Sequence, residues 1–181
     1  FSLGLPLAPV SWSGLSLAVG LSVAQSLHPD LRLKWPNDIW LGMRKLGGIL
    51  IETASFGDLR YVVVGMGVNL GPREGSGLST PPAWLQELQP GMDVPLALEQ
   101  IVAPLIKAIR QFETLGFAPF QAGFNALDTL AGRSVSLSDG IQGTAQGVDE
   151  TGALLLHTAQ GLRKVTSSEV SVRPVPCATA G

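Results

Sequence analysis

The first 29 residues carry no charged side chain, and their apolar positions follow two patterns in turn. Residues 1–6 alternate in a way that predicts a strand already under way, which indicates a fragment of a longer protein. Leu17, Leu21, Ala24 and Leu27 then fall on one helical face, so a helix is predicted from an N-cap at Ser11 to about Leu27. Its serines and glycines argue against a membrane span.

Strand patterns fill residues 31–70. Three short segments, 31–35, 39–41 and 46–53, are separated by turn residues, which predicts a sheet rich in hairpins. Residues 60–70 are dominated by valine and alternate little. This pattern predicts a central strand that is buried on both faces.

In the second half of the chain, sequence patterns typical of helices are followed by patterns typical of short strands. A Gly/Pro/Ser-rich segment at 71–82 predicts a flexible loop, and helices are expected at 82–88, 96–115 and 119–129. Five short strands are predicted at 134–138, 142–149, 153–157, 162–165 and 170–173, with turn residues between them. Strands so closely spaced indicate a small barrel. The chain is therefore expected to be α+β, with a first domain at 1–130, a barrel at 131–175 and a tail at 176–181.

Charge and cysteine content exclude several classes of function. A net charge of −2 without charge runs offers no basic stripe for nucleic acid and no polybasic patch for a membrane surface. A single cysteine, Cys177, permits no internal disulfide, so the cytoplasm is the expected location. His28 and His157 show no metal-ligand spacing with it.

Three polar or glycine-rich segments stand out within 36 residues. They are K-W-P-N-D at 34–38, R-K-L-G-G-I-L at 44–50 and G-M-G-V-N at 65–69. Taken singly, each has an ordinary explanation. The first reads as an Asx turn with a solvated lysine, the second as a surface pair before a strand, and the third as a packing feature of a valine strand.

In this order and spacing, the three segments resemble those of the biotin protein ligases. The resemblance continues into a G-x-L-L-L hairpin at 152–156 and a last strand that carries Arg173. It implies a class II synthetase-like biotin/lipoyl ligase fold with a mixed or antiparallel sheet, N-terminally incomplete, followed by an SH3-like barrel. The Gly/Arg-rich loop that family members carry upstream is not in this sequence.

The resemblance also implies a two-step reaction and its residues. Biotin and ATP would give biotinyl-adenylate, and a lysine of the biotin carboxyl carrier protein of acetyl-CoA carboxylase would take the biotinyl group. Catalytic roles fall to Lys45, Lys34 and Asp38, with Asp38 also a candidate for holding Mg²⁺. Substrate and ATP contacts fall to Lys45, Asn37, Gly65, Gly67, Asn69 and Arg173.

Elementary chemistry supports some of these assignments. A carboxylate and an α-phosphate repel by roughly 4 kcal/mol at ~4 Å and a dielectric near 20, and Lys45 would remove that repulsion. Gly65 and Gly67 lack Cβ atoms, so a flat ring could lie against the strand and bind its amides. Asn69 offers a donor and an acceptor to the adenine edge. A strand-end cap for Asn69 and a solvated terminal Arg173 stay open alternatives.

Other functions also fit this sequence. A lipoate or octanoate ligase shares the fold by family relation, and a truncated module could bind biotin or the carrier without chemistry. A homodimer is a family possibility. DNA binding is expected only if a helix-turn-helix lies upstream.

Overall fold

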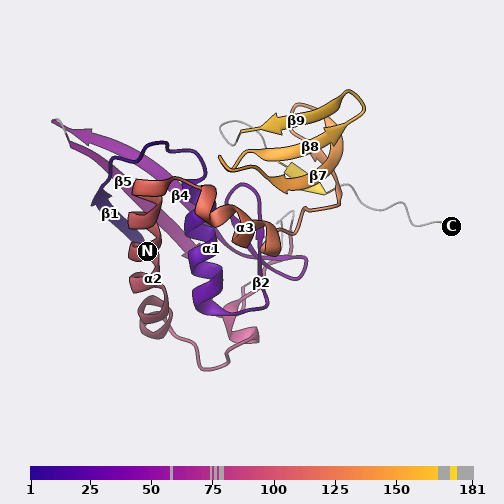
Figure 1. Ribbon diagram of the computed structural model, residues 1–181. Helices are drawn as coiled ribbons and strands as arrows, with labels where there is room; N and C mark the ends of the chain where they lie inside the picture. Colours follow the sequence, from indigo (N-terminus) through magenta and orange to yellow (C-terminus); the bar gives the residue numbers. More distant parts are fainter. Residues whose placement is uncertain (58, 74, 76, 78–79, 167–171, 175–181) are drawn as a thin grey trace.

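The computed structural model describes residues 1–57, 59–73, 75, 77, 80–166 and 172–174, although not the side chains of Phe56 and of residues 172–174. Two antiparallel five-stranded sheets and a few helices make up this part of the chain (Figure 1). The predicted α+β class is confirmed. The predicted tail at 176–181 lies outside the described residues, and the domain division at residue 130 stays a prediction.

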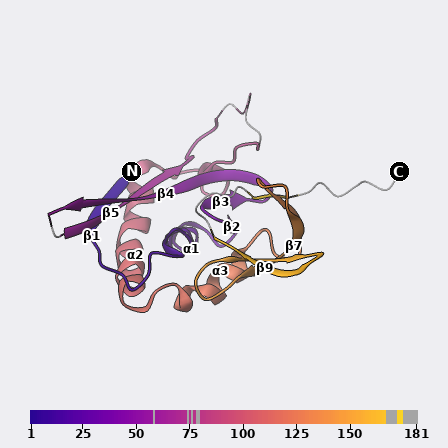
Figure 2. The same cartoon turned by 90° about the horizontal axis from the view of Figure 1, so that it is seen from above.

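The first sheet is antiparallel throughout. Its strands are β1 (Ser2–Pro6), β2 (Leu31–Lys34), β3 (Asp38–Leu41), β4 (Arg44–Phe56) and β5 (Leu59–Val68), in the order β1-β5-β4-β3-β2. Helices α1 (Leu15–Leu27) and α2 (Val94–Leu115) lie on one side of it (Figure 2). Neither of these two helices covers the opposite side.

The position and burial of β5 differ from the prediction. The middle strand of the sheet is β4, and β5 lies between it and the edge strand β1. Val62, Val64 and Met66 are buried, whereas Tyr61 and Val63 on the alternate face are only half-buried. Because helices cover one face only, the valine run does not mean burial on both faces.

Helix α1 begins at Leu15, four residues after the predicted cap. Gly14 takes the N-cap position with a left-handed φ of 83°, while the Ser11 hydroxyl accepts a hydrogen bond from the Ser13 amide instead. A Cβ at Gly14 would lie 2.6 Å from the Phe117 ring. Close packing against Phe117 therefore requires glycine here and delays the helix start.

The remaining helices are shorter than predicted, except α2. The segment predicted as a helix at 82–88 contains only the 3₁₀ turn η1 (Leu85–Glu87), and α3 (Gln121–Leu127) follows a second turn, η2 (Ala118–Phe120). Helix α2 starts where the Asp93 carboxylate accepts from the Leu96 amide, an ordinary N-cap. None of the helices in the described ranges combines the length and hydropathy that a membrane span needs.

The second sheet contains the five strands that the sequence predicts. They are β6 (Ser134–Leu137), β7 (Gln142–Val148), β8 (Leu154–Thr158), β9 (Gly161–Val165) and β10 (Val172–Pro174), in the order β10-β6-β7-β8-β9. Strands β9 and β10 are its two edges, and among the described residues they do not pair with each other. The sheet is thus open in this part of the chain, and closure into an SH3-like barrel stays a prediction.

A mostly buried carboxylate, that of Asp128, lies where α3 ends against β2. Its Oδ1 accepts a hydrogen bond from the Leu130 amide at 2.9 Å, and its Oδ2 is buried without a partner among the described residues. Burial raises the pKa of Asp128 from its ordinary 3.8 to about 6, against a smaller lowering by the Leu130 amide. An ionised Asp128 therefore destabilises the folded state at neutral pH.

We expect the free energy of unfolding to depend on the ionisation of Asp128. Since its pKa is raised on folding, its contribution is fully present below pH 3.8 and is lost as pH rises to about 6. Asp128→Asn keeps the acceptor for Leu130 and removes the charge, so it should stabilise the protein by about 1–2 kcal/mol at pH 7.5 and by less at pH 4.5. Urea unfolding of both proteins at the two pH values measures this. A variant with the same stability gain at both would contradict it.

Candidate active site

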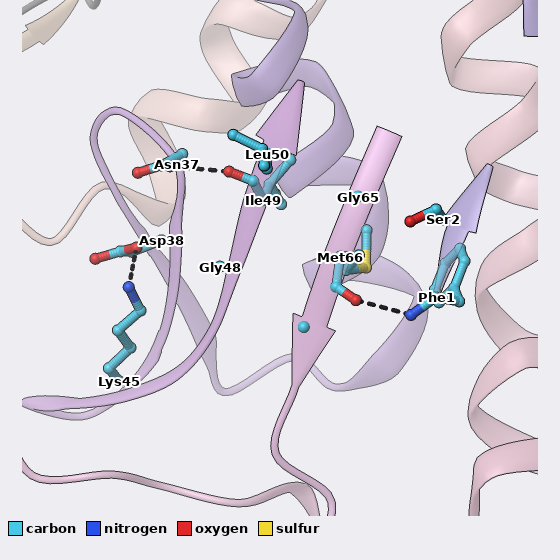
Figure 3. A pocket seen from close by; sticks show the side chains of 11 residues that line it. Phe1, Ser2, Asn37, Asp38, Lys45, Gly48, Ile49, Leu50, Gly65 and Met66 are labelled. Carbon is cyan, nitrogen blue, oxygen red and sulfur yellow. Dashed lines mark hydrogen bonds and ion pairs between the residues drawn. The ribbon is translucent and has the colours of Figure 1, made fainter. Parts of the chain in front are cut away.

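A pocket of about 490 Å³ lies on the face of the first sheet that the helices leave open (Figure 3). Strands β1, β3, β4 and β5, the chain start and the turn before β3 contribute its lining, which consists of Phe1, Ser2, Asn37, Asp38, Lys45, Gly48, Ile49, Leu50, Gly65, Met66 and Gly67. In Figure 3, Asp38 and Lys45 lie at one end, and Phe1 and Met66 lie at the other. The ion pair thus marks one end of the pocket, and the exposed side chain of Leu50 adds apolar surface beside Gly65.

The charged end is an ion pair between Lys45 and Asp38. The Lys45 Nζ lies 2.6 Å from the Asp38 Oδ1, with Lys45 about half exposed and Asp38 largely covered. A Cβ at Gly48, which faces Asp38 across the strands, would lie 3.5 Å from the Nζ and 3.6 Å from the Oδ1. Gly48 therefore leaves room around the ion pair, and the half-exposed ammonium can reach a second anion.

Two hydrogen bonds hold Asn37 against β4, and a third holds the preceding residue, Pro36. Its side-chain Nδ2 donates to the Ile49 carbonyl at 2.8 Å, and the Ile49 amide donates to the Asn37 carbonyl at 2.9 Å. The Ser16 hydroxyl donates to the carbonyl of Pro36, whose peptide bond with Trp35 is cis. These bonds fix the residue 34–38 turn on the rim of the pocket.

Gly65 and Gly67 form part of the pocket floor. A Cβ at Gly67 would meet nothing within 4 Å, and one at Gly65 would make only ordinary contacts. Gly65 pairs with Ser2 of β1 and Leu50 of β4, so its backbone belongs to the sheet ladder. The two glycines therefore offer a ligand open space above the strand. The geometry gives less support to backbone amides that are free to bind it.

Lys34 lies beside the ion pair and outside the lining of the large pocket. It pairs with Asp38 in the β2–β3 register, and its Nζ lies 5.4 Å from the centroid of the Trp40 ring. It also lines a second, very small cavity together with Asn37 and Asp38. Its catalytic role stays a prediction.

Asn69 is not among the residues that line the pocket, and the side chain of Arg173 cannot be placed relative to it. The Asn69 Nδ2 donates to the Ala83 carbonyl at 3.0 Å, and its Oδ1 accepts from Arg73 at 3.3 Å. These contacts match the alternative in which Asn69 caps the following loop. The backbone of Arg173 pairs with Ser136 in the second sheet, and its side chain is outside the described part of the structure.

Sequence reasoning missed the segment that runs beside Lys45. The Lys45 amide donates to the Pro81 carbonyl, and the Ala83 amide donates to the Lys45 carbonyl. Arg44 fastens this segment through two hydrogen bonds to Glu87, and its guanidinium carbon lies 5.9 Å from the Trp84 ring centroid. The hydrogen bonds from Arg44 lower the pKa of Glu87. In the sequence, the one indication of this anchored segment is Arg44, which directly precedes Lys45.

Metal-binding groups are sparse in the described residues. No cluster of three or more His, Cys, Asp or Glu side chains occurs there. Asp38 is the one carboxylate in the pocket lining, and it is already paired with Lys45. A lone paired carboxylate does not make a metal centre by itself.

Two family models match this chain. The model described as "Biotin/lipoate A/B protein ligase family" matches residues 5–69, and "Biotin protein ligase C terminal domain" matches residues 131–173. The first range contains all three motifs on the sheet, and the second contains all five strands after α3 except the last residue of β10.

Curated relatives cover most of the chain. A bifunctional ligase/repressor BirA of Escherichia coli is 34% identical over 175 residues, with 91% of this chain and 54% of that protein covered. A biotin–[acetyl-CoA-carboxylase] ligase of Paracoccus denitrificans is 30% identical, with 87% and 70% covered. The chain spans about half the length of the BirA relatives that it matches.

Solved structures show the same fold. The apo biotin protein ligase of Aquifex aeolicus superposes with a TM-score of 0.82 at 26% identity, covering 96% of this chain and 82% of that one. The same enzyme in complex with biotin and ATP gives a TM-score of 0.82 and covers 96% and 78%. Motifs, fold and relatives agree, and the chain belongs to the biotin protein ligase family.

Proposed function

We propose that this chain supplies part of the active site of an ATP-dependent ligase that activates biotin and transfers it to a protein lysine. One observation carries the proposal: Lys45 stands half-exposed beside Asp38 in a pocket whose floor is open above Gly65 and Gly67 and is flanked by the exposed apolar side chain of Leu50. Biotin has the matching shape, with an uncharged bicyclic ring at one end and a carboxylate at the other. Members of the family are named for this reaction, and one is solved with biotin and ATP.

In the first step, Lys45 would counter the repulsion between two anions. A biotin carboxylate oxygen bonds to the α-phosphorus of ATP, and the bond from that phosphorus to the pyrophosphate oxygen breaks. Both reactants carry negative charge, so a fixed ammonium between them lowers the barrier more than it stabilises either alone. The pairing with Asp38 keeps the Lys45 ammonium in one place before the reactants arrive.

In the second step, the amine of an acceptor lysine bonds to the acyl carbon of biotinyl-adenylate, and AMP leaves with the electron pair of the broken C–O bond. The amine gives up one proton, which passes to solvent water, and Asp38 is the lining carboxylate that could orient the amine for attack. Biotin carboxyl carrier protein as the acceptor stays a prediction. Lys34 pairs with Asp38 in the β2–β3 register and Asn37 precedes it in the turn, and their roles in the reaction stay predictions.

Magnesium stays a prediction of the resemblance. Mg²⁺ is usually bound by one or two carboxylates together with nucleotide phosphates and water. Asp38 is the residue that could take part, but its pairing with Lys45 argues that the phosphates would hold most of the ion.

Biotin-dependent exchange of labelled pyrophosphate into ATP tests the proposal on the protein that contains this chain. We expect exchange with biotin and little with lipoate, because a glycine floor beside the exposed apolar side chain of Leu50 suits a flat bicyclic ring. Exchange with lipoate in place of biotin would move the assignment to a lipoate ligase. A folded protein that is silent with both acids would leave only a binding module.

A further inference from the structure

The turn between β7 and β8 reaches from the second sheet to the segment that carries the 34–38 turn. The indole Nε1 of Trp35 donates to the Gly152 carbonyl at 3.1 Å, in a fully buried environment, and residues 35 and 152 are 117 positions apart. The Ser13 hydroxyl donates to the Thr151 carbonyl at 2.7 Å. Two side chains of the first sheet and its helices thus recognise the backbone of this one turn.

The approach of the turn depends on two glycines. Gly152 has a φ of 82°, and a Cβ there would lie 2.8 Å from the Gly14 Cα and 3.1 Å from a Leu17 methyl group. Backbone lies against backbone at this point, so no flexible side chain could give way. The β7–β8 turn is therefore fitted to the start of α1 as well as to Trp35.

The turn is built by Asp149, whose carboxylate is buried. Its Oδ1 accepts from the Thr151 amide at 2.9 Å, the Thr151 hydroxyl at 2.7 Å and the Ala153 amide at 3.1 Å. Its Oδ2 lies 2.7 Å from the Lys164 Nζ on β9. Burial raises the pKa of Asp149, but the hydrogen bonds from Lys164, Thr151 and Ala153 outweigh it and bring the pKa to about 2. The carboxylate is thus ionised at neutral pH and holds the Gly152 carbonyl in a fixed direction.

Trp35 leads directly to the charged end of the pocket. It is followed by Pro36, whose carbonyl is held by Ser16, and by Asn37, which is bonded to Ile49. Asp38 comes next and pairs with Lys45. A shift of the fully buried indole would therefore move the carboxylate that orients the lysine.

We propose that the β7–β8 turn is a positioning element for the active site. The Gly152 carbonyl, set in place by Asp149, holds the Trp35 indole and thereby the Asp38 carboxylate opposite Lys45. Asp149 is a positioning residue, since it acts through the turn and its side chain bonds to Thr151, Ala153 and Lys164, none of which lines the pocket. The kinetic consequence rests on the proposed function, whereas the link from Asp149 to Trp35 does not.

The test compares Asp149→Ala with two matched variants in the protein labelled with 5-fluorotryptophan. The four tryptophans give separate ¹⁹F resonances, and Trp35→Phe assigns the one of interest. Asp149→Asn keeps an oxygen that can accept from Thr151 and Ala153. Thr158→Ala perturbs the opposite turn of the same β8 strand, where Thr158 bonds within the turn to Gly161 and Gln160.

We expect Asp149→Ala to move the Trp35 resonance and to lower kcat for biotin-dependent pyrophosphate exchange about 10-fold. Both are measured at a temperature well below the melting temperature of the variant. Asp149→Asn should restore most of both, and Thr158→Ala should change neither. An unmoved Trp35 resonance in Asp149→Ala, or an equal shift in Thr158→Ala, would overturn the proposal. If the parent protein shows no exchange, the proposed function fails, and the resonance alone decides whether the turn positions Trp35.

Discussion

Replacement of Lys45 by alanine is expected to lower the rate of biotinyl-adenylate formation by about 10³-fold or more. The half-exposed ammonium is the cation that lies beside Asp38 in the pocket lining, so its loss leaves the carboxylate and the α-phosphate facing each other unscreened. Such a loss corresponds to about 4 kcal/mol of transition-state stabilisation. Single-turnover formation of the adenylate, followed by quenching and separation, measures it directly.

The fold should survive this substitution. Lys45 keeps its backbone bonds to Pro81 and Ala83, and a half-exposed lysine side chain contributes little to stability. Lys107→Ala, at an exposed position of α2, is the matched control for loss of a lysine and should leave the rate unchanged. If Lys45→Ala formed adenylate at the parent rate, the assigned role of Lys45 would be wrong.

Gly67→Val is expected to weaken biotin binding about 100-fold while leaving the melting temperature nearly unchanged. A Cβ at Gly67 meets no protein atom within 4 Å, so the two added methyl groups project into the pocket instead of into the core. Valine also suits a strand. The added volume then occupies the space above the glycine floor, where the ring is proposed to lie. Isothermal titration with biotin measures the loss.

Gly4→Val provides the comparison for this prediction. Gly4 lies exposed on β1 of the same sheet, and a Cβ there likewise meets nothing within 4 Å, but it is not part of the pocket lining. It should bind biotin as tightly as the parent protein. Equal weakening in both variants would point to a general effect of valine on the sheet, and unchanged binding in Gly67→Val would place the ring elsewhere.

Local pattern was sufficient to predict most strands and the site motifs. The hairpins at 31–53 and the five strands after residue 131 carry turn residues between apolar runs, and both features are set by neighbours in sequence. The helix ends were less accurate. Ser11 is a good cap by residue type, yet the helix starts at Leu15 because Gly14 must pack closely on Phe117, which is far away in the chain.

The burial of β5 and the role of Asn69 show the same limit. A run of valines does not reveal which face the helices cover, and only α1 and α2 on one side of the sheet decide it. In the structure the amide of Asn69 binds Ala83 and Arg73, partners that periodicity does not place. Its predicted contact with adenine stays a prediction, because each amide atom can make a further hydrogen bond.

The sequence by itself determined the family resemblance, the α+β class and the three segments from which the pocket is built. Tertiary structure alone decided that Lys45 pairs with Asp38, that Gly48 leaves room for the pair, and that Gly152 holds Trp35 from the other sheet. The physical reason is that motifs fix residue types and local turns, which depend on near neighbours. The direction of a side chain depends on strand register and on packing between distant segments, and these form only when the whole chain folds.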